Sequence, residues 1–222
     1  MEYARGFGQF CVVLPDQNAV IAITSGAMEM QTVLDYVWEH LLPGMSDTPL
    51  NEDPEVQENL EKKLSALAYP SPVTMRTSSE TYRWHEKCYE VGSNEAGITH
   101  IRFHFTDNEF IFSFQDQTET QTLEIGNEVW LENQLKIAGD QMKVKAAGTW
   151  RKKNVLELSL RFIETAYCDT WTFHFVNDSV KVSAARNVWI IPGLSDSAFL
   201  PTLIGFQYRD RDMWVGNGGG QQ

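Results

Sequence analysis

The segment ITHIRFHF at residues 98–105, followed closely by FIFSF at residues 110–114, decides the fold class of this chain. In the first segment Ile101, Phe103 and Phe105 alternate with polar residues, and the second segment repeats the pattern. Side chains of a β-strand point to opposite faces with a period of two, so this spacing is typical of a strand with one apolar face. We therefore expect a strand at each segment.

The same kind of pattern continues through most of the second half of the chain. Further strands are expected at residues 81–91, 120–125, 141–150, 155–164, 170–176 and 180–188. About eight short antiparallel strands separated by turns are the signature of an up-and-down barrel or a sandwich. A barrel of this size has either a packed interior or one small ligand cavity, and alternation alone leaves both possibilities open.

The first part of the chain is organised differently. Two apolar runs, residues 9–14 and 19–24, flank a turn-forming segment and predict a β-hairpin. Apolar residues then recur at helical spacing, which predicts one helix that is capped by Thr24 or Ser25 and stops at Pro43. A second helix should begin at Asp53 and Pro54, and its apolar stripe consists of Val56, Leu60, Leu64 and Leu67.

These patterns give an α+β chain that is divided into four parts. We expect a terminal hairpin and helix at residues 1–45, a linker with one helix at 46–80, a β-barrel at 81–210 and a flexible tail at 211–222.

Composition restricts the classes of partner. Eighteen Lys and Arg residues against thirty Asp and Glu residues give a net charge of −12, so nucleic acid and anionic membrane surfaces are not expected partners. The cysteines, Cys11, Cys88 and Cys168, are odd in number and widely spaced, which predicts reduced thiols in a cytoplasmic protein. No apolar run is long enough to span a bilayer.

Motifs for the common enzyme classes are missing from the sequence. It contains no Gly-x-Ser-x-Gly, Ser-x-x-Lys, Walker A or His-Glu-x-x-His pattern and no dinucleotide-binding glycine pattern. We therefore predict no catalytic residues and no cofactor. His100 and His104 share a strand face but lie about 13 Å apart along a regular strand, too far to hold one ion, so no metal site is predicted.

Charged residues within apolar strands provide the candidate site. Arg161, Glu164, Asp169 and Arg186 occur among Leu, Phe, Ile and Val in neighbouring predicted strands. Because buried charges persist only when they are paired, these residues either form an ion-pair cluster that fixes the barrel or bind a ligand. In the ligand-binding alternative, Trp130, Trp150 and Trp171 would line a cavity.

Two regions resemble a known family of enzymes. The sequence Gly-Phe-Gly-Gln-Phe at residues 6–10, with the apolar runs at 11–14 and 19–26 around Pro15, resembles the end of the catalytic domain in serine hydrolases related to class C β-lactamases and penicillin-binding proteins. The second half resembles the β-rich, lipocalin-like C-terminal extension of some of these hydrolases. The residues that carry this second resemblance are Gly148-x-Trp150, residues 161–165, residues 168–170 and Asn187-Val188.

The resemblance implies an accessory function rather than catalysis. The family's serine, lysine and tyrosine boxes precede the region represented here, and the third box, Lys-Thr-Gly or His-x-Gly, is not seen near Met1. The chain is therefore expected to modulate substrate access or assembly of a hydrolase. A lipocalin-like carrier of a small apolar molecule and an independent hydrolase are the alternatives. Unpaired apolar edges of the hairpin also predict a partner, either a second copy in a dimer or a hydrolase catalytic domain.

Overall fold

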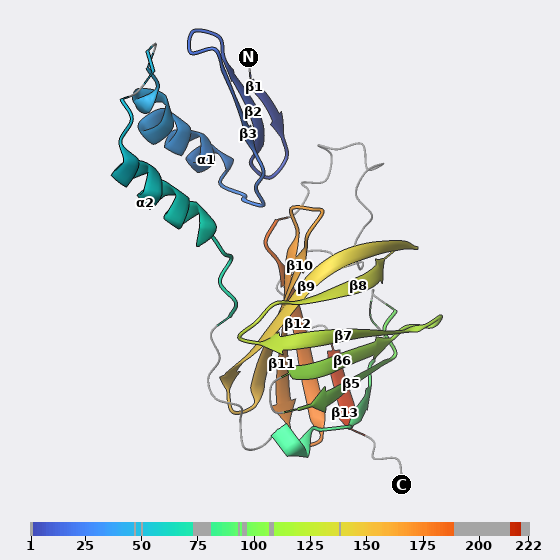
Figure 1. The fold of residues 1–222 in the computed structure, drawn as a ribbon. Coiled ribbons are helices and arrows are strands. Elements are labelled where there is room, and N and C mark those ends of the chain that lie inside the picture. Colours follow the sequence, from blue (N-terminus) through green and yellow to red (C-terminus); the bar gives the residue numbers. More distant parts are fainter. Residues whose placement is uncertain are drawn as a thin grey trace. The chain divides into compact units, whose positions relative to one another are not determined.

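The computed structural model describes residues 2–46, 48–49, 51–72, 81–92, 94, 97–106, 109–137, 139–188 and 214–218 (Figure 1). The chain divides into two compact units, Met1–Pro70 and Ser71–Gln222, and each is considered by itself. This division falls within the segment 46–80 that the sequence predicted as a linker.

The first unit begins with a three-stranded antiparallel sheet. Its strands β1 (Glu2–Arg5), β2 (Gln9–Leu14) and β3 (Ala19–Ile23) follow one another in space as in sequence. The predicted hairpin is the β2–β3 pair, and β1 was not predicted. Gly8 has a φ of +76° in the turn after β1, and a Cβ there would come within 3.1 Å of the Ser25 hydroxyl, so this turn requires glycine.

One helical segment packs on this sheet. It runs through α1 (Met30–Tyr36), the π-helical η1 (Val37–Leu41) and the 3₁₀ turn η2 (Leu42–Gly44). The predicted start at Ser25 is wrong, because the helix begins after Glu29 without a side-chain cap. The core that joins sheet and helix consists of Phe10, Val12 and Leu34. Leu14, Ile21, Ile23, Val33 and Trp38 pack around these three and are only partly buried.

The second predicted helix is α2 (Pro54–Ser65). The Asp53 carboxylate caps it by accepting hydrogen bonds from the backbone N–H groups of Glu55 and Val56, each at 3.1 Å. Every residue of α2 is exposed, including its apolar stripe.

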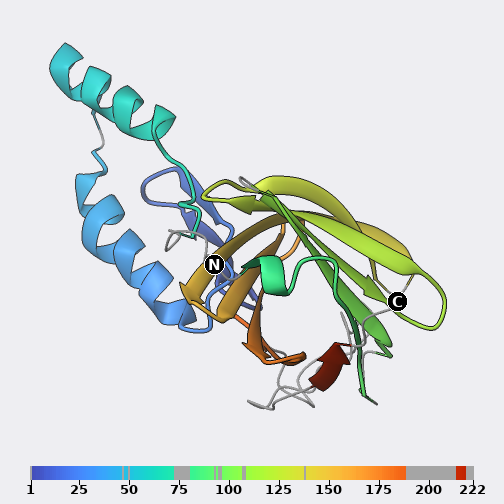
Figure 2. The same cartoon turned by 90° about the horizontal axis from the view of Figure 1, so that it is seen from below.

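The second unit is a single sheet wrapped into a barrel (Figures 1 and 2). A 3₁₀ turn, η3 (Thr81–Arg83), precedes ten strands. They are β4 (Cys88–Glu90), β5 (His100–Phe105), β6 (Glu109–Gln115), β7 (Thr120–Asn127), β8 (Leu131–Ile137), β9 (Asp140–Lys152), β10 (Val155–Phe162), β11 (Cys168–Val176), β12 (Ser179–Arg186) and β13 (Trp214–Gly218).

Strand order shows how the barrel closes. The sheet runs β10-β11-β12-β13-β4-β5-β6-β7-β9-β8, and an additional β9–β10 pairing joins the first strand of this order to the last but one. The pairs are antiparallel except where β7 meets β9 in parallel at Gly126 and Asn127. The prediction of a mainly antiparallel barrel after a hairpin and two helices is therefore confirmed at this level.

Three segments of the barrel differ from the expectation. Residues 81–91 form a turn and the short β4 rather than one strand. The strand β8 was not predicted. The expected tail at 211–222 contains β13, which pairs with β12 and β4.

Aromatic and aliphatic side chains pack the inner face of the barrel. The centroid of the Phe103 ring lies 5.1 Å from that of Phe112, 5.0 Å from that of Phe173 and 5.4 Å from that of Phe175. These four side chains are fully buried, as are Leu156, Leu158 and Leu160 of β10. Gly148 lets this packing close, because a Cβ there would stand 2.5 Å from the ring of Phe110. Side chains of the barrel itself thus fill its centre.

Candidate functional site

The predicted charged residues are brought together in part. Asp169 near the start of β11 is the register partner of Arg186 at the end of β12. The guanidinium donates two hydrogen bonds to the carboxylate, Nε to Oδ1 at 2.6 Å and a terminal nitrogen to Oδ2 at 2.7 Å. The Asp169 side chain is 3% exposed and that of Arg186 is 20% exposed. This is a bidentate, largely buried ion pair.

Neighbouring groups also stabilise the end of the barrel at which Asp169 and Arg186 form their ion pair. The Arg186 guanidinium lies over the Tyr167 ring at 4.6 Å, in a cation–π contact. Asn187 accepts a hydrogen bond from the Cys168 N–H at 2.7 Å and donates one to the Ala166 carbonyl at 3.0 Å. These contacts tie the turn between β10 and β11 to the end of β12, which supports the ion-pair interpretation of the cluster.

Burial governs the titration of this group. It raises the pKa of Asp169 above its ordinary value, and the hydrogen bonds from Arg186 act in the opposite direction. Burial also raises the pKa of the Cys168 thiol and of the Tyr167 hydroxyl. A raised pKa leaves less of the Cys168 thiol in its reactive thiolate form at neutral pH.

Two predicted members lie outside this ion pair. Arg161 on β10 places its guanidinium 5.5 Å from the centroid of the Trp130 ring. Glu164 lies in the turn after β10, where its side chain is exposed and its carboxylate is 3.8 Å from the Lys143 ammonium. The expectation of one four-residue cluster therefore does not hold, because Glu164 lies beyond the last residue of β10 and its side chain is 61% exposed.

Trp150 and Trp171 are packing residues of the barrel interior. The Trp171 ring meets the Phe112 ring edge-on at 5.7 Å, and it is almost fully buried. The Trp150 ring stacks on the Trp84 ring at 5.7 Å. Neither has the free apolar surface that a cavity-lining residue would offer a ligand.

Sequence reasoning missed Trp84, which closes the other end of the barrel. It follows η3 directly, is buried, and stacks on Phe175 with ring centroids 4.5 Å apart. Lys87 holds the same turn in place through an ion pair with Asp178, at 2.6 Å, in the turn between β11 and β12.

A group of titratable residues on this turn was also missed. His85, Glu86 and His104 place their metal-binding atoms within 4.8 Å of one another. The Nδ1 atom of His104 is hydrogen-bonded to a carboxylate oxygen of Glu86. That bond holds the pKa of Glu86 below its ordinary value.

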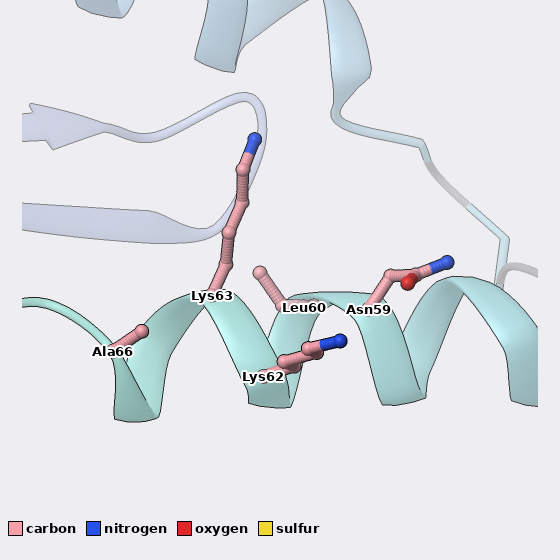
Figure 3. Close-up of a pocket in the computed structure, with 5 residues that line it drawn as sticks. All are labelled: Asn59, Leu60, Lys62, Lys63 and Ala66. Atoms are coloured by element: carbon pink, nitrogen blue, oxygen red, sulfur yellow. The ribbon is translucent and has the colours of Figure 1, made fainter.

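A surface hollow lies beside α2 (Figure 3). The residues that line it are Asn59, Leu60, Lys62, Lys63 and Ala66. The first four belong to α2 and Ala66 is its C-cap, so a single exposed helix lines the hollow and it does not enclose a ligand site. None of the helices in the described part of the chain combines the length and apolarity needed to cross a membrane.

Comparisons with known proteins add little beyond these observations. No protein-family model and no curated protein matches the chain. Among solved structures, a fatty-acid-binding protein from Manduca sexta has 12% identity and a TM-score of 0.38, over 48% of this chain and 92% of its own. One from Drosophila melanogaster brain has 12% identity and a TM-score of 0.39, over 47% and 93%. A Schistosoma mansoni fatty-acid-binding protein in complex with arachidonic acid has 7% identity and a TM-score of 0.40, over 50% and 90%.

Proposed function

We propose that the chain is a non-catalytic accessory region of a serine hydrolase related to class C β-lactamases. In this proposal the first unit extends the antiparallel sheet of a catalytic domain, and the barrel modulates substrate access or assembly. The observation that supports a partner for the first unit is the edge strand β3, which is apolar over all its residues, Ala19–Ile23, and pairs only with β2 among the residues that the structure describes.

An apolar, unprotected edge strand such as β3 is expected to pair with a strand from another domain or molecule. Soluble proteins protect sheet edges with charges, proline or bulges, and β3 has none of these devices. Its Val20 side chain is 66% exposed. Another antiparallel strand would satisfy the outward N–H and C=O groups of β3 and cover its apolar side chains, which is the geometry of strand addition.

The small core of the first unit supports the same conclusion. Phe10, Val12 and Leu34 are the buried members of the cluster between sheet and helix. Domains of this size bury a small share of their surface and need additional contacts to be stable. A larger sheet continuing beyond β3 would supply these contacts.

Packing within the barrel agrees with an accessory role. Because its interior is filled by its own aromatic rings, the barrel presents a rigid outer surface to a neighbouring domain. The cysteines Cys11, Cys88 and Cys168 are free thiols, which suits the cytoplasmic location that belongs to the proposal.

The test is to capture the protein from the cells that naturally make it, under non-denaturing conditions, with an antibody against the barrel. Peptide mass spectrometry then identifies the captured polypeptides. We expect a domain that carries Ser-x-x-Lys and a tyrosine box, in the same polypeptide or in a stoichiometric complex. In that assembly the backbone amides of β3 should be protected from hydrogen exchange. Val20→Lys should expose them, while Leu67→Lys on the linker should not. A 25.3-kDa monomer, or a dimer of such chains, without a hydrolase domain would refute the proposal.

A second candidate function is the binding of a small apolar molecule inside a lipocalin-like barrel. One observation favours it. Tyr89 on β4 is fully buried, and its hydroxyl has no hydrogen-bond partner among the residues that the structure describes. An unpaired buried hydroxyl costs about 1–3 kcal/mol, and a ligand with one polar end could satisfy it if the aromatic rings moved apart.

Native mass spectrometry of the purified chain tests this candidate. A bound molecule of a few hundred daltons that Tyr89→Phe weakens would establish binding inside the barrel. A spectrum without added mass, together with no displacement of a fluorescent fatty-acid probe by oleate, would rule this candidate out.

A further inference from the structure

Two segments far apart in the sequence place two imidazoles and a carboxylate side by side. His85 and Glu86 belong to the turn between η3 and β4, and His104 lies near the end of β5. The metal-binding atoms of the three side chains lie within 4.8 Å of one another. His85 and Glu86 are exposed and His104 is half-buried, so the group is open to ions from solution.

Backbone contacts hold these residues in position. Glu86 adopts a left-handed backbone conformation with a φ of +59°, and its N–H donates to the Phe103 carbonyl at 2.9 Å. The Phe105 N–H donates to Nδ1 of His85 at 3.1 Å. The turn is thus fixed on β5, and the rings of His85 and His104 lie with their centroids 4.8 Å apart.

The hydrogen bonds also define which side-chain atoms of this group have a lone pair available for a cation. An ionised Glu86 accepts hydrogen bonds, so Nδ1 of His104 donates and Nε2 of a neutral His104 keeps its lone pair. Nδ1 of His85 accepts from a backbone N–H, so in neutral His85 the proton is on Nε2. A cation shared by His104 and Glu86 would therefore take the place of the proton between Nδ1 and the carboxylate, and His85 would give up its bond from the Phe105 N–H to present Nδ1.

We propose that His85, Glu86 and His104 bind one divalent transition-metal ion, with water completing its coordination. Two imidazoles and one carboxylate are a donor set of zinc, nickel and copper sites, whereas calcium and magnesium take oxygen ligands. Neighbouring ligands in a tetrahedral site with bonds near 2.0–2.2 Å are about 3.5 Å apart, so the most distant ligand atoms must approach by up to about 1.3 Å and the hydrogen-bonded atoms of His104 and Glu86 must move apart. Exposed side chains on a fixed turn can make that adjustment by rotation.

The site has a structural consequence that is independent of the accessory role. Trp84, which closes this end of the barrel against Phe175 and Trp150, immediately precedes His85. A metal ion that joins His85 and Glu86 to β5 would hold Trp84 in place. Metal binding is therefore expected to stabilise the barrel and to change the fluorescence of Trp84.

The experiment is an isothermal calorimetric titration of the purified, chelator-treated full chain with ZnCl₂. We expect one equivalent to bind with micromolar affinity. His104→Ala and Glu86→Gln should each weaken binding by about tenfold or more, and His85→Ala should have a smaller effect. His100→Ala, on the same face of the same strand, is the matched control and should leave the affinity unchanged within twofold.

A second measurement needs no variant of the site. Nickel added to the ¹⁵N-labelled chain should broaden the imidazole signals of His85 and His104 while those of His100 and His174 stay sharp. The proposal is overturned if zinc fails to bind below 100 μM, if His104→Ala binds zinc within threefold of the wild type, or if nickel broadens all histidines alike.

Discussion

Replacing Asp169 by asparagine tests whether the buried ion pair stabilises the barrel or serves a ligand. The substitution keeps the shape of the side chain and removes its charge, which leaves the Arg186 guanidinium without its bidentate acceptor. Removing one member of a fully buried pair costs about 3–5 kcal/mol. Arg186 is 20% exposed and keeps its contact with the Tyr167 ring, so we expect a cost somewhat below that range, about 2–3 kcal/mol.

A double-mutant cycle separates the interaction from the cost of an orphaned charge. Arg186→Met alone removes the cation, and the double variant Asp169→Asn/Arg186→Met replaces the pair with groups that need no charge partner. Such replacements are often close to neutral, so we expect the double variant to be more stable than Asp169→Asn by about 1 kcal/mol or more.

Urea unfolding, followed by tryptophan fluorescence of the barrel, measures these differences through the transition midpoint at unchanged slope. Glu164→Gln is the matched control, because its carboxylate is exposed and makes a long ion pair with Lys143. It should change the free energy of unfolding by less than about 0.5 kcal/mol. If Asp169→Asn is no more destabilising than this control, the ion pair does not stabilise the barrel, and its structural interpretation is refuted.

Three further substitutions probe the interior and one turn. Gly148→Ala puts a methyl group 2.5 Å from the Phe110 ring and should lower the free energy of unfolding by about 1–3 kcal/mol; an unchanged urea midpoint would show that the interior is loosely packed. Tyr89→Phe removes an unpaired buried hydroxyl and should leave stability unchanged or higher in thermal unfolding; a loss above about 1 kcal/mol would mean that the hydroxyl has a partner. Asp116 accepts hydrogen bonds from the hydroxyl and backbone N–H of Thr118 and from the backbone N–H of Glu119, and these bonds lower the pKa of Asp116 below its ordinary value of 3.8. The ionised carboxylate therefore stabilises the folded state above pH 3.8, and this stabilisation is lost as the pH falls through the lower folded-state pKa. Asp116→Ala should therefore cost about 1 kcal/mol at pH 7, and the difference from the wild type should shrink in urea titrations below pH 4; a difference independent of pH would contradict this.

Alternation of apolar and polar residues predicted most strands of the barrel but missed β8. This strand was missed because the polar residue Asn133 occupies one of its buried positions. Its side chain accepts a hydrogen bond from the Glu124 N–H at 2.7 Å and donates one to the Glu124 carbonyl at 2.8 Å. Asn133 thereby bridges β7 and β8 with its amide group, a contact between strands that no local pattern in the sequence reveals.

The candidate site shows the same limit of sequence-based prediction, here for residues that are far apart in the sequence. Apolar surroundings identified Asp169 and Arg186 as residues that must be paired, and the structure pairs them. The group around His104 was missed because it depends on strand register. The β4–β5 pairing aligns Cys88 with Arg102, and continuing that register places Glu86 beside His104. A shift of one residue would point these side chains to opposite faces, and the sequence of the connecting loop does not fix the register.

The two ends of the barrel are closed by different chemistry, and this difference limits where function can lie. Asp169 and Phe175 are six residues apart on β11, about 20 Å along a strand, and each belongs to a separate closing group. At one end a buried ion pair and Asn187 fasten the turn between β10 and β11. At the other end Trp84 covers Phe175, and the residues that follow it are exposed and titratable. Aromatic rings fill the space between these groups, and an ion or a partner domain that binds the outside of the barrel would meet, at the Trp84 end, exposed groups that can respond to it.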